Sequence, residues 1–76
     1  MTKSELRQIQ RIATITSSTE ESLIYFRSKG IDWMLLDVTK QFTKRLILYR
    51  KESDNKYIQV REFQRLGQMF RYIKTQ

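Results

Sequence analysis

Six cationic side chains recur through residues 48–73, in the stretch LYRKESDNKYIQVREFQRLGQMFRYI: Arg50, Lys51, Lys56, Arg61, Arg65 and Arg71. Such groups bind phosphate through charge-assisted hydrogen bonds, and arginine also stacks on bases. Residues 1–38 carry five cations and five anions, whereas residues 39–76 carry ten cations and three anions. The net charge of +7 therefore lies entirely in the second half, which predicts a polyanionic partner such as nucleic acid.

No recognisable catalytic constellation accompanies these cations. The chain has neither His nor Cys, which excludes His-based triads, thiolate nucleophiles and the usual zinc ligands. The one adjacent acidic pair, Glu20 and Glu21, would not face one another on a helix. No glycine-rich loop is present to cradle a phosphate. We therefore expect a binding protein and not an enzyme, with no metal, cofactor or small-molecule substrate.

The elements that would position the cations begin with two expected helices. Residues 2–5 fit a capping box and are followed by apolar residues at helical spacing, although residues 12–16 are mostly β-branched and would also suit a short strand. Ser17 and Ser18, with Glu20 and Glu21 three residues later, favour the start of a second helix. Gly30 would end that helix, because glycine readily adopts the left-handed conformation after a helix.

Two further helices and a strand are expected in the second half. Asp32 is a good N-cap for a helix over residues 32–42, with Phe42 on its apolar face. Residues 45–51 are rich in β-formers, which favours a strand. A long basic helix over residues 55–73 would follow. Its apolar stripe would consist of Phe63, Leu66, Phe70 and Ile73.

These elements predict a mostly α fold and a small single domain over residues 1–76. Within it, residues 31–73 would form an RNA-binding core, and residues 1–30 an N-terminal extension of unknown role. Short apolar runs do not distinguish helix from strand, so an α+β fold of the βαββαβ ferredoxin-like type is the alternative. Its strands would lie near residues 9–15, 31–38, 45–51 and 70–75. No apolar run approaches the length that spans a membrane.

Short motifs in the second half carry a family resemblance. Residues 31–33 read Ile-Asp-Trp, and Phe42 follows ten residues after the aspartate. The residues that continue the pattern are Ile47, Leu48, Lys51, Ser53, Asp54, Phe63, Arg65, Arg71 and Ile73. In this order they resemble the bacterial-type ribosomal small-subunit protein 18 family. Tyr49 stands at that family's Pro, and Asp54 at its Gly.

The resemblance implies a structural constituent of a bacterial-type small ribosomal subunit. Its partners would be small-subunit rRNA, ribosomal small-subunit protein 6 and other subunit proteins. It would be located on the ribosome, in bacterial cytoplasm or in the matrix of a mitochondrion or plastid, and a start at Met1 agrees with a chain from which no presequence was removed. The expected RNA-binding residues are Lys44, Arg45, Arg50, Lys51, Lys56, Arg61, Arg65, Arg71 and Lys74.

Two other functions remain open. A small DNA-binding regulator of phage or plasmid type would read bases from one strip of the last helix, formed by Arg61, Gln64, Arg65 and Gln68. Residues 61–73 also resemble the C-terminal domain of phycobilisome linkers, which are small and basic. In an RNA-binding protein, Tyr49, Tyr57 and Tyr72 would provide rings that stack on exposed bases.

Overall fold

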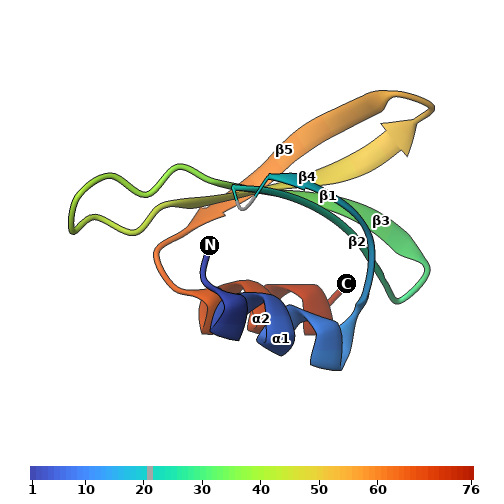
Figure 1. Cartoon of the computed structure of the whole chain (residues 1–76). Coiled ribbons are helices and arrows are strands. Elements are labelled where there is room, and N and C mark those ends of the chain that lie inside the picture. Colours follow the sequence, from blue (N-terminus) through green and yellow to red (C-terminus); the bar gives the residue numbers. More distant parts are fainter. Residues whose placement is uncertain (21) are drawn as a thin grey trace.

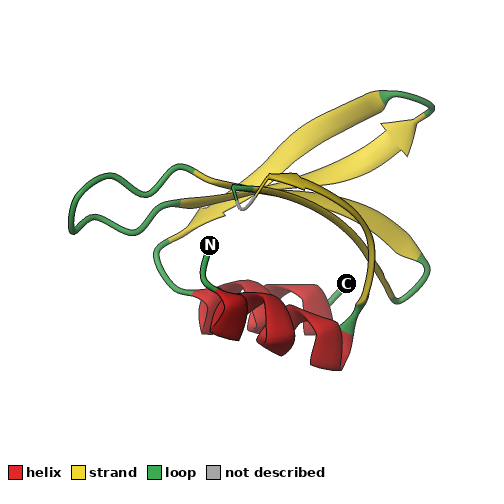
Figure 2. Ribbon diagram, viewed as in Figure 1, coloured by secondary structure: helices red, strands yellow, loops and turns green. Residues whose placement is uncertain are grey.

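The computed structural model describes residues 1–20 and 22–76, which form one antiparallel sheet with two helices on one face (Figures 1 and 2). The elements along the chain are α1 (Lys3–Ile12), β1 (Thr14–Glu20), β2 (Leu23–Ser28), β3 (Ile31–Asp37), β4 (Leu46–Ser53), β5 (Lys56–Phe63) and α2 (Leu66–Lys74). The strands lie in the sheet in their order along the chain. Neither of the described helices is long and apolar enough to cross a membrane.

The expectation of a mostly α fold is wrong, because five strands and only two helices make up the described chain. The fold is α+β, as in the alternative, but the order of elements is αβββββα and not βαββαβ. Residues 31–38 and 45–51 largely coincide with β3 and β4, whereas residues 70–75 lie at the end of α2. The expected boundary at residue 30 falls in the turn between β2 and β3, which pair along their whole lengths.

The first helix is confirmed, with its capping box. Thr2 N donates to Glu5 Oε1 over 3.0 Å, and Glu5 N donates to Thr2 Oγ1 over 3.2 Å. The second expected helix is wrong, because β1 and β2 occupy its residues; Glu21 lies outside the described residues. Gly30 has φ of 72° and its neighbour Lys29 has φ of 54°. Positive φ serves a two-residue hairpin turn as well as a helix end, so Gly30 alone did not decide between them.

The prediction of a helix over residues 32–42 is wrong, because residues 31–37 form β3. Their side chains alternate between the two faces of the sheet. Trp33 and Leu35 are buried under the helices, and Trp33 pairs with Phe26 of β2. Asp32 forms no helix cap; its Oδ1 accepts from Arg27 Nε over 2.7 Å across the β2–β3 hairpin. Phe42, expected in a buried stripe, is 103% exposed in the loop before β4.

Of the long helix expected over residues 55–73, only the second half is helical. Residues 56–63 form β5, which folds back on β4 through a turn at Asp54 and Asn55, where Asn55 has φ of 61°. Only residues 66–74 are helical. The expected strand over residues 45–51 is confirmed as part of β4.

The core lies between the sheet and the two helices. The expected stripe is only partly right: Met69 is fully buried on α2, while Phe70 is half-buried and Phe63 belongs to β5. The buried cluster consists of Ile9, Ile24, Phe26, Trp33, Leu35, Leu46, Leu48, Phe63, Leu66, Met69 and Ile73. It draws on α1, four strands and α2, so burial of apolar surface holds both ends of the chain against the sheet.

Candidate nucleic-acid interface

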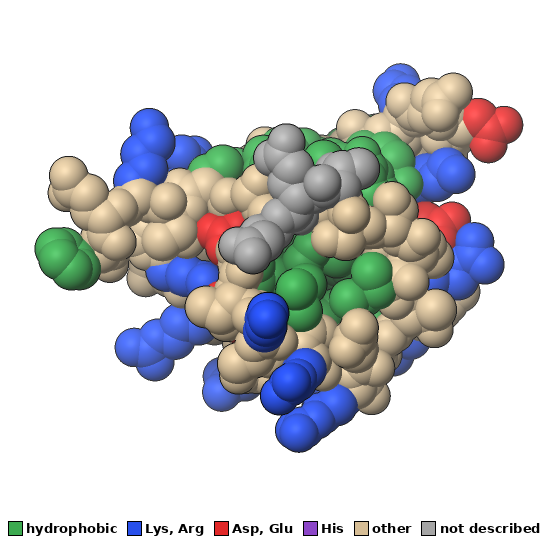
Figure 3. Space-filling model, viewed as in Figure 1, with side chains coloured by type: hydrophobic (Ala, Val, Ile, Leu, Met, Phe, Trp, Pro, Cys, Tyr) green, Lys and Arg blue, Asp and Glu red, His purple; other side chains and the backbone are tan. Residues whose placement is uncertain are grey.

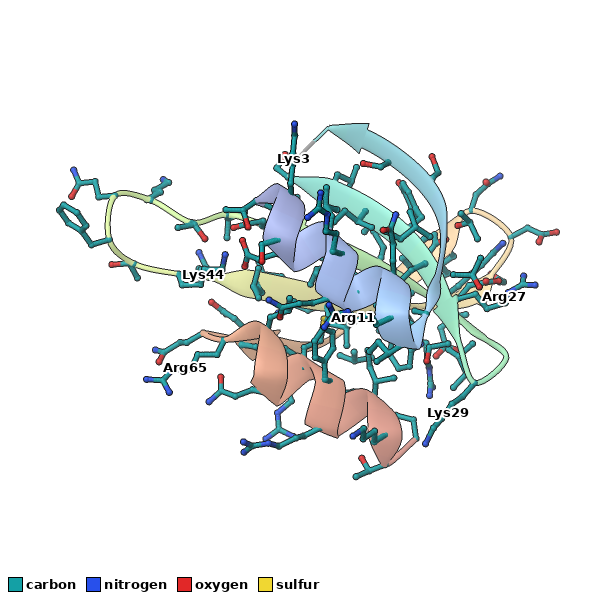
Figure 4. All side chains as sticks on the ribbon, turned by 60° about the horizontal axis from the view of Figure 1, so that its bottom comes forward. Lys3, Arg11, Arg27, Lys29, Lys44 and Arg65 are labelled. Atoms are coloured by element: carbon teal, nitrogen blue, oxygen red, sulfur yellow. The ribbon has the colours of Figure 1, made fainter. Side chains whose placement is uncertain are left out.

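The positive charge of the chain is concentrated on the helix layer, defined as residues 1–12 and 64–76. This layer carries six cations and one carboxylate, a net charge of +5, whereas residues 13–63 carry nine cations and seven carboxylates, a net charge of +2. Because α1 and α2 lie next to one another beneath the sheet, charges from both ends of the chain share one face (Figures 1 and 4). The positive charge of residues 39–76 therefore does not lie on one surface: part of it joins the cations of residues 1–12 on the helix layer, and the rest lies elsewhere.

Three exposed cations follow the outer side of α1. Lys3, Arg7 and Arg11 are spaced four residues apart, on a helix whose Ile9 is buried. None of the three has an acidic partner among the described residues. Sequence reasoning missed them because the first half of the chain is neutral overall. Their four-residue spacing opposite Leu6 and Ile9 was the signal that would have identified them.

Three of the expected RNA-binding residues complete the helix layer. Arg65 is the N-cap residue of α2, and Arg71 and Lys74 lie in its last turn; all three are exposed. Cations in a last turn also complement the helix dipole, which is a purely structural role for two of them. Lys29 joins this end of the layer, because its Nζ donates to the carbonyl oxygen of Lys74. Figure 4 shows Lys3 and Arg11 along α1, Arg65 where α2 starts and Lys29 near its end.

Arg61 lies on β5 and not on the last helix. Its guanidinium carbon is 5.7 Å from the ring centroid of Tyr72, within the range of a cation–π contact. A groove between β5 and α2 is lined by Arg61, Arg71 and Tyr72, so two guanidinium groups from different elements face the same hollow. The Tyr72 ring also packs against Trp33 and Phe63, at centroid distances of 6.3 and 5.7 Å. Tyr72 is thus chiefly a packing residue.

The strip expected to read DNA bases does not exist on one helix. Arg61 is in β5 and Gln64 precedes α2, while Gln68 lies in its first turn. Gln68 Oε1 accepts from the backbone N–H groups of Gln64 and Arg65, both over 3.2 Å. Gln68 therefore caps the start of α2, and its side-chain oxygen is engaged in that role.

Three expected RNA-binding cations are neutralised by carboxylates of the chain. Lys44 Nζ lies 2.5 Å from Glu5 Oε2 and 3.7 Å from Asp37 Oδ2. Arg45 pairs with Glu62. Arg50 pairs with Glu52 over 3.2 Å. These pairs leave little net charge for a polyanion at the three sites.

The remaining expected residues lie apart from the helix layer. Lys51 and Lys56 belong to the β4–β5 hairpin. Tyr49 alternates with the buried Leu48 and therefore lies on the sheet face opposite the helices. On the same face, the rings of Tyr25 and Tyr57 meet edge to face, with centroids 5.7 Å apart. Two of the three tyrosines expected to stack on bases, Tyr49 and Tyr57, thus lie on the other side of the molecule from the helix layer, whereas Tyr72 belongs to α2.

The carboxylates of Glu5 and Asp37 hold the start of α1 against the end of β3. Burial raises the pKa of each, but hydrogen bonds and Lys44 lower it more, so both pKa values lie below their usual range. For Glu5 the hydrogen bonds come from Lys44 and Thr2. For Asp37 they come chiefly from Thr39. The ionised forms are therefore favoured in the folded chain.

Acid should destabilise the chain through these two groups. Because their folded pKa values are depressed, their contribution is present above the unfolded pKa, about 4, and is lost as pH falls through the folded values. We expect Lys44→Met to lower the free energy of unfolding by about 1–2 kcal/mol at neutral pH, since it removes the cation of Glu5 and leaves Asp37 with the N-terminal ammonium of Met1, 3.3 Å away, as its remaining cation. Its acid dependence should also be shallower. Urea titrations across pH, with the exposed Lys40→Met as control, measure both effects.

The comparisons with known proteins give no relative. No family model matches the chain, and it has no significant match among the curated proteins or the solved structures. The described residues contain no group of three or more acidic side chains that would hold a metal ion. The function is therefore inferred from the surface of the chain itself.

Proposed function

We propose that the chain is an RNA-binding domain that holds the phosphate backbone against its helix layer. The observation that carries this proposal is the net charge of +5 on that layer. Its one carboxylate, Glu5, is already bound to Lys44, so the outer side chains present an uninterrupted positive field. Cations gathered in this way repel one another, and a polyanion relieves that repulsion while releasing its own counterions.

The arrangement favours RNA over a DNA operator. A DNA regulator of the helix-turn-helix kind needs several base-reading side chains on one recognition helix, and here that strip is divided between β5 and α2. Folded RNA is held mainly through shape, phosphate and ribose contacts, and guanidinium groups suit both phosphate forks and base stacking. Four of the six cations in the helix layer are arginines.

A place in the small ribosomal subunit is a narrower form of the same proposal. In it, the helix layer would contact small-subunit rRNA. The family resemblance gives this form little support, because residues 32–42 and 56–63, which it assigned to helices, belong mainly to β3 and β5. Co-sedimentation of the native protein with small ribosomal subunits, or its absence from them, decides this narrower form without affecting RNA binding itself.

Neutralising cations on the helix layer should weaken RNA binding more than the same change elsewhere. The test pair is Arg7→Gln with Arg11→Gln on α1, and the matched control is Lys51→Gln with Lys56→Gln on the β4–β5 hairpin. Both double variants remove two positive charges, so long-range electrostatics change equally. We expect the α1 variant alone to lower the slope of log affinity against log salt by about 2, one for each cation that no longer meets a phosphate. Filter binding measures it, and equal effects in both variants would place the RNA elsewhere on the surface.

A further inference from the structure

The loop between β3 and β4 forms a narrow arm, defined as residues 38–45, that projects beyond the rest of the sheet (Figures 1 and 2). Phe42 stands at its turn and is 103% exposed. The other exposed large apolar side chains among the described residues, Ile12 and Ile58, are only 39% and 42% exposed. Hydrophobic side-chain atoms are visible at the outer end of the arm in Figure 3, with cationic side chains behind them.

The arm is held in shape by its own hydrogen bonds. Lys40 and Thr43 exchange two backbone hydrogen bonds of 3.1 and 2.9 Å, which closes the turn around Gln41 and Phe42. Nearer the sheet, Val38 N donates to the carbonyl oxygen of Arg45 over 2.9 Å. Phe42 therefore lies on a hairpin that is already ordered, so binding a partner costs less conformational entropy than it would on a flexible loop.

Side-chain bonds and backbone strain support the same geometry. Thr39 N donates to Asp37 Oδ1 over 3.0 Å, and Arg45 N donates to Thr39 Oγ1 over 3.3 Å, so the base of the arm is braced on both strands. Gln41 has φ of 53°, which a tight two-residue hairpin turn requires although it costs a non-glycine residue energy. The arm therefore keeps its turn although Phe42 gains no burial from it.

The arm adjoins the helix layer. A hollow at its side is lined by Phe42, Thr43, Lys44, Gln64 and Arg65, which connects the ring to the start of α2. Figure 4 shows Lys44 and Arg65 near one another at this side of the molecule. Lys40, on the arm itself, is exposed and has no acidic partner among the described residues. A strand bound along the helix layer can therefore reach Lys40 and Phe42 from Arg65, past Lys44, whose charge is already paired with Glu5 and Asp37.

We propose that Phe42 stacks on an unpaired base of RNA whose adjoining backbone is held by Arg65 and the rest of the helix layer. This rests on the proposed function and adds the class of RNA: a helix interrupted by a bulge or loop. Unpaired bases are the ones that proteins stack on aromatic side chains, because bases inside a duplex are already stacked. The arm extends about four residues beyond β3, which corresponds to about 13 Å of extended chain and is enough to reach past a backbone.

The same features fit a lipid surface less well. A segment that lies in a membrane interface buries a broad apolar face together with its cations. The tip of the arm has a single large apolar side chain, flanked by Gln41 and Thr43. One ring is sufficient for a stacking contact with one base, so the chemistry of the tip matches RNA.

Two RNA hairpins of equal length test the inference, one with a single bulged nucleotide and one fully paired. Wild type should bind the bulged hairpin more tightly. Phe42→Ala should lose about 5- to 150-fold in affinity for the bulged hairpin, the equivalent of one base stack, and little for the paired one. Phe42→Trp should retain the preference, whereas Phe42→Leu should not, because leucine is apolar but offers no ring. All three variants should stay folded by circular dichroism, since the side chain is exposed.

A fluorescent adenine analogue at the bulge gives a second readout: wild type should quench it on binding and Phe42→Ala should not. Equal binding of both hairpins by wild type and Phe42→Ala would overturn the stacking role while leaving the RNA-binding proposal intact. Failure of wild type to bind either hairpin would overturn both. Phe42-dependent binding to vesicles of anionic lipid, or Phe42-dependent dimerisation in ultracentrifugation, without preference for the bulge would assign the ring to a membrane or to a second copy of the chain.

Discussion

The affinity of the chain for RNA is expected to fall about a thousandfold between about 50 and about 200 mM salt. Each phosphate contact by a cation releases counterions and contributes about 0.9 to the slope of log affinity against log salt for a duplex. The six cations of the helix layer would therefore give a slope of about 5. Fluorescence anisotropy with a labelled hairpin, repeated over the salt range, measures this slope.

The slope should divide evenly between the two helices. Neutralising Lys3, Arg7 and Arg11 together should reduce it by about half, because α1 supplies three of the six cations. Neutralising Arg65, Arg71 and Lys74 should have a similar effect. An affinity that stays flat over this salt range would contradict binding through phosphate contacts altogether.

Replacing Phe26 by Ala should lower the free energy of unfolding by about 3–5 kcal/mol. Phe26 is only 1% exposed, and its ring lies in the cluster between the sheet and the helices. Its removal therefore costs both the transfer energy of the ring and the cavity left behind. A domain of this size is stabilised by only about 5–15 kcal/mol, so the variant should be close to unfolding at room temperature.

Phe42→Ala is the matched control, since it makes the same chemical change at a side chain that is fully exposed. We expect it to change the free energy of unfolding by less than about 0.5 kcal/mol. Urea denaturation followed by circular dichroism compares the two variants directly. A large destabilisation by Phe42→Ala would mean that the ring is buried, as the expected helix over residues 32–42 had implied.

The sequence alone determined the features that depend on near neighbours in the chain. The capping box at Thr2 and Glu5 predicted the start of α1, because its hydrogen bonds span three residues. The run of β-formers in residues 45–51 predicted β4 because strand propensity is also a local property. The basic character of Arg65, Arg71 and Lys74 is visible in the sequence, whereas Lys3, Arg7 and Arg11 lie in the half of the chain whose cations and anions balance.

Only the tertiary structure decided the features that depend on residues far apart. The spacing of Leu35, Val38 and Phe42 fits the apolar stripe of a helix, whereas the spacing of Trp33 and Leu35 fits one face of a strand. Pairing with β2 and β4 selects the strand, because it satisfies the backbone hydrogen bonds and buries Trp33 and Leu35. The strand then ends before residue 42, which leaves Phe42 exposed on the arm. Packing of α1 and α2 against the same sheet face likewise brings the two sets of cations together. Local propensity contains no information on which distant elements share a face, so the helix layer and the arm could be recognised only in the folded chain.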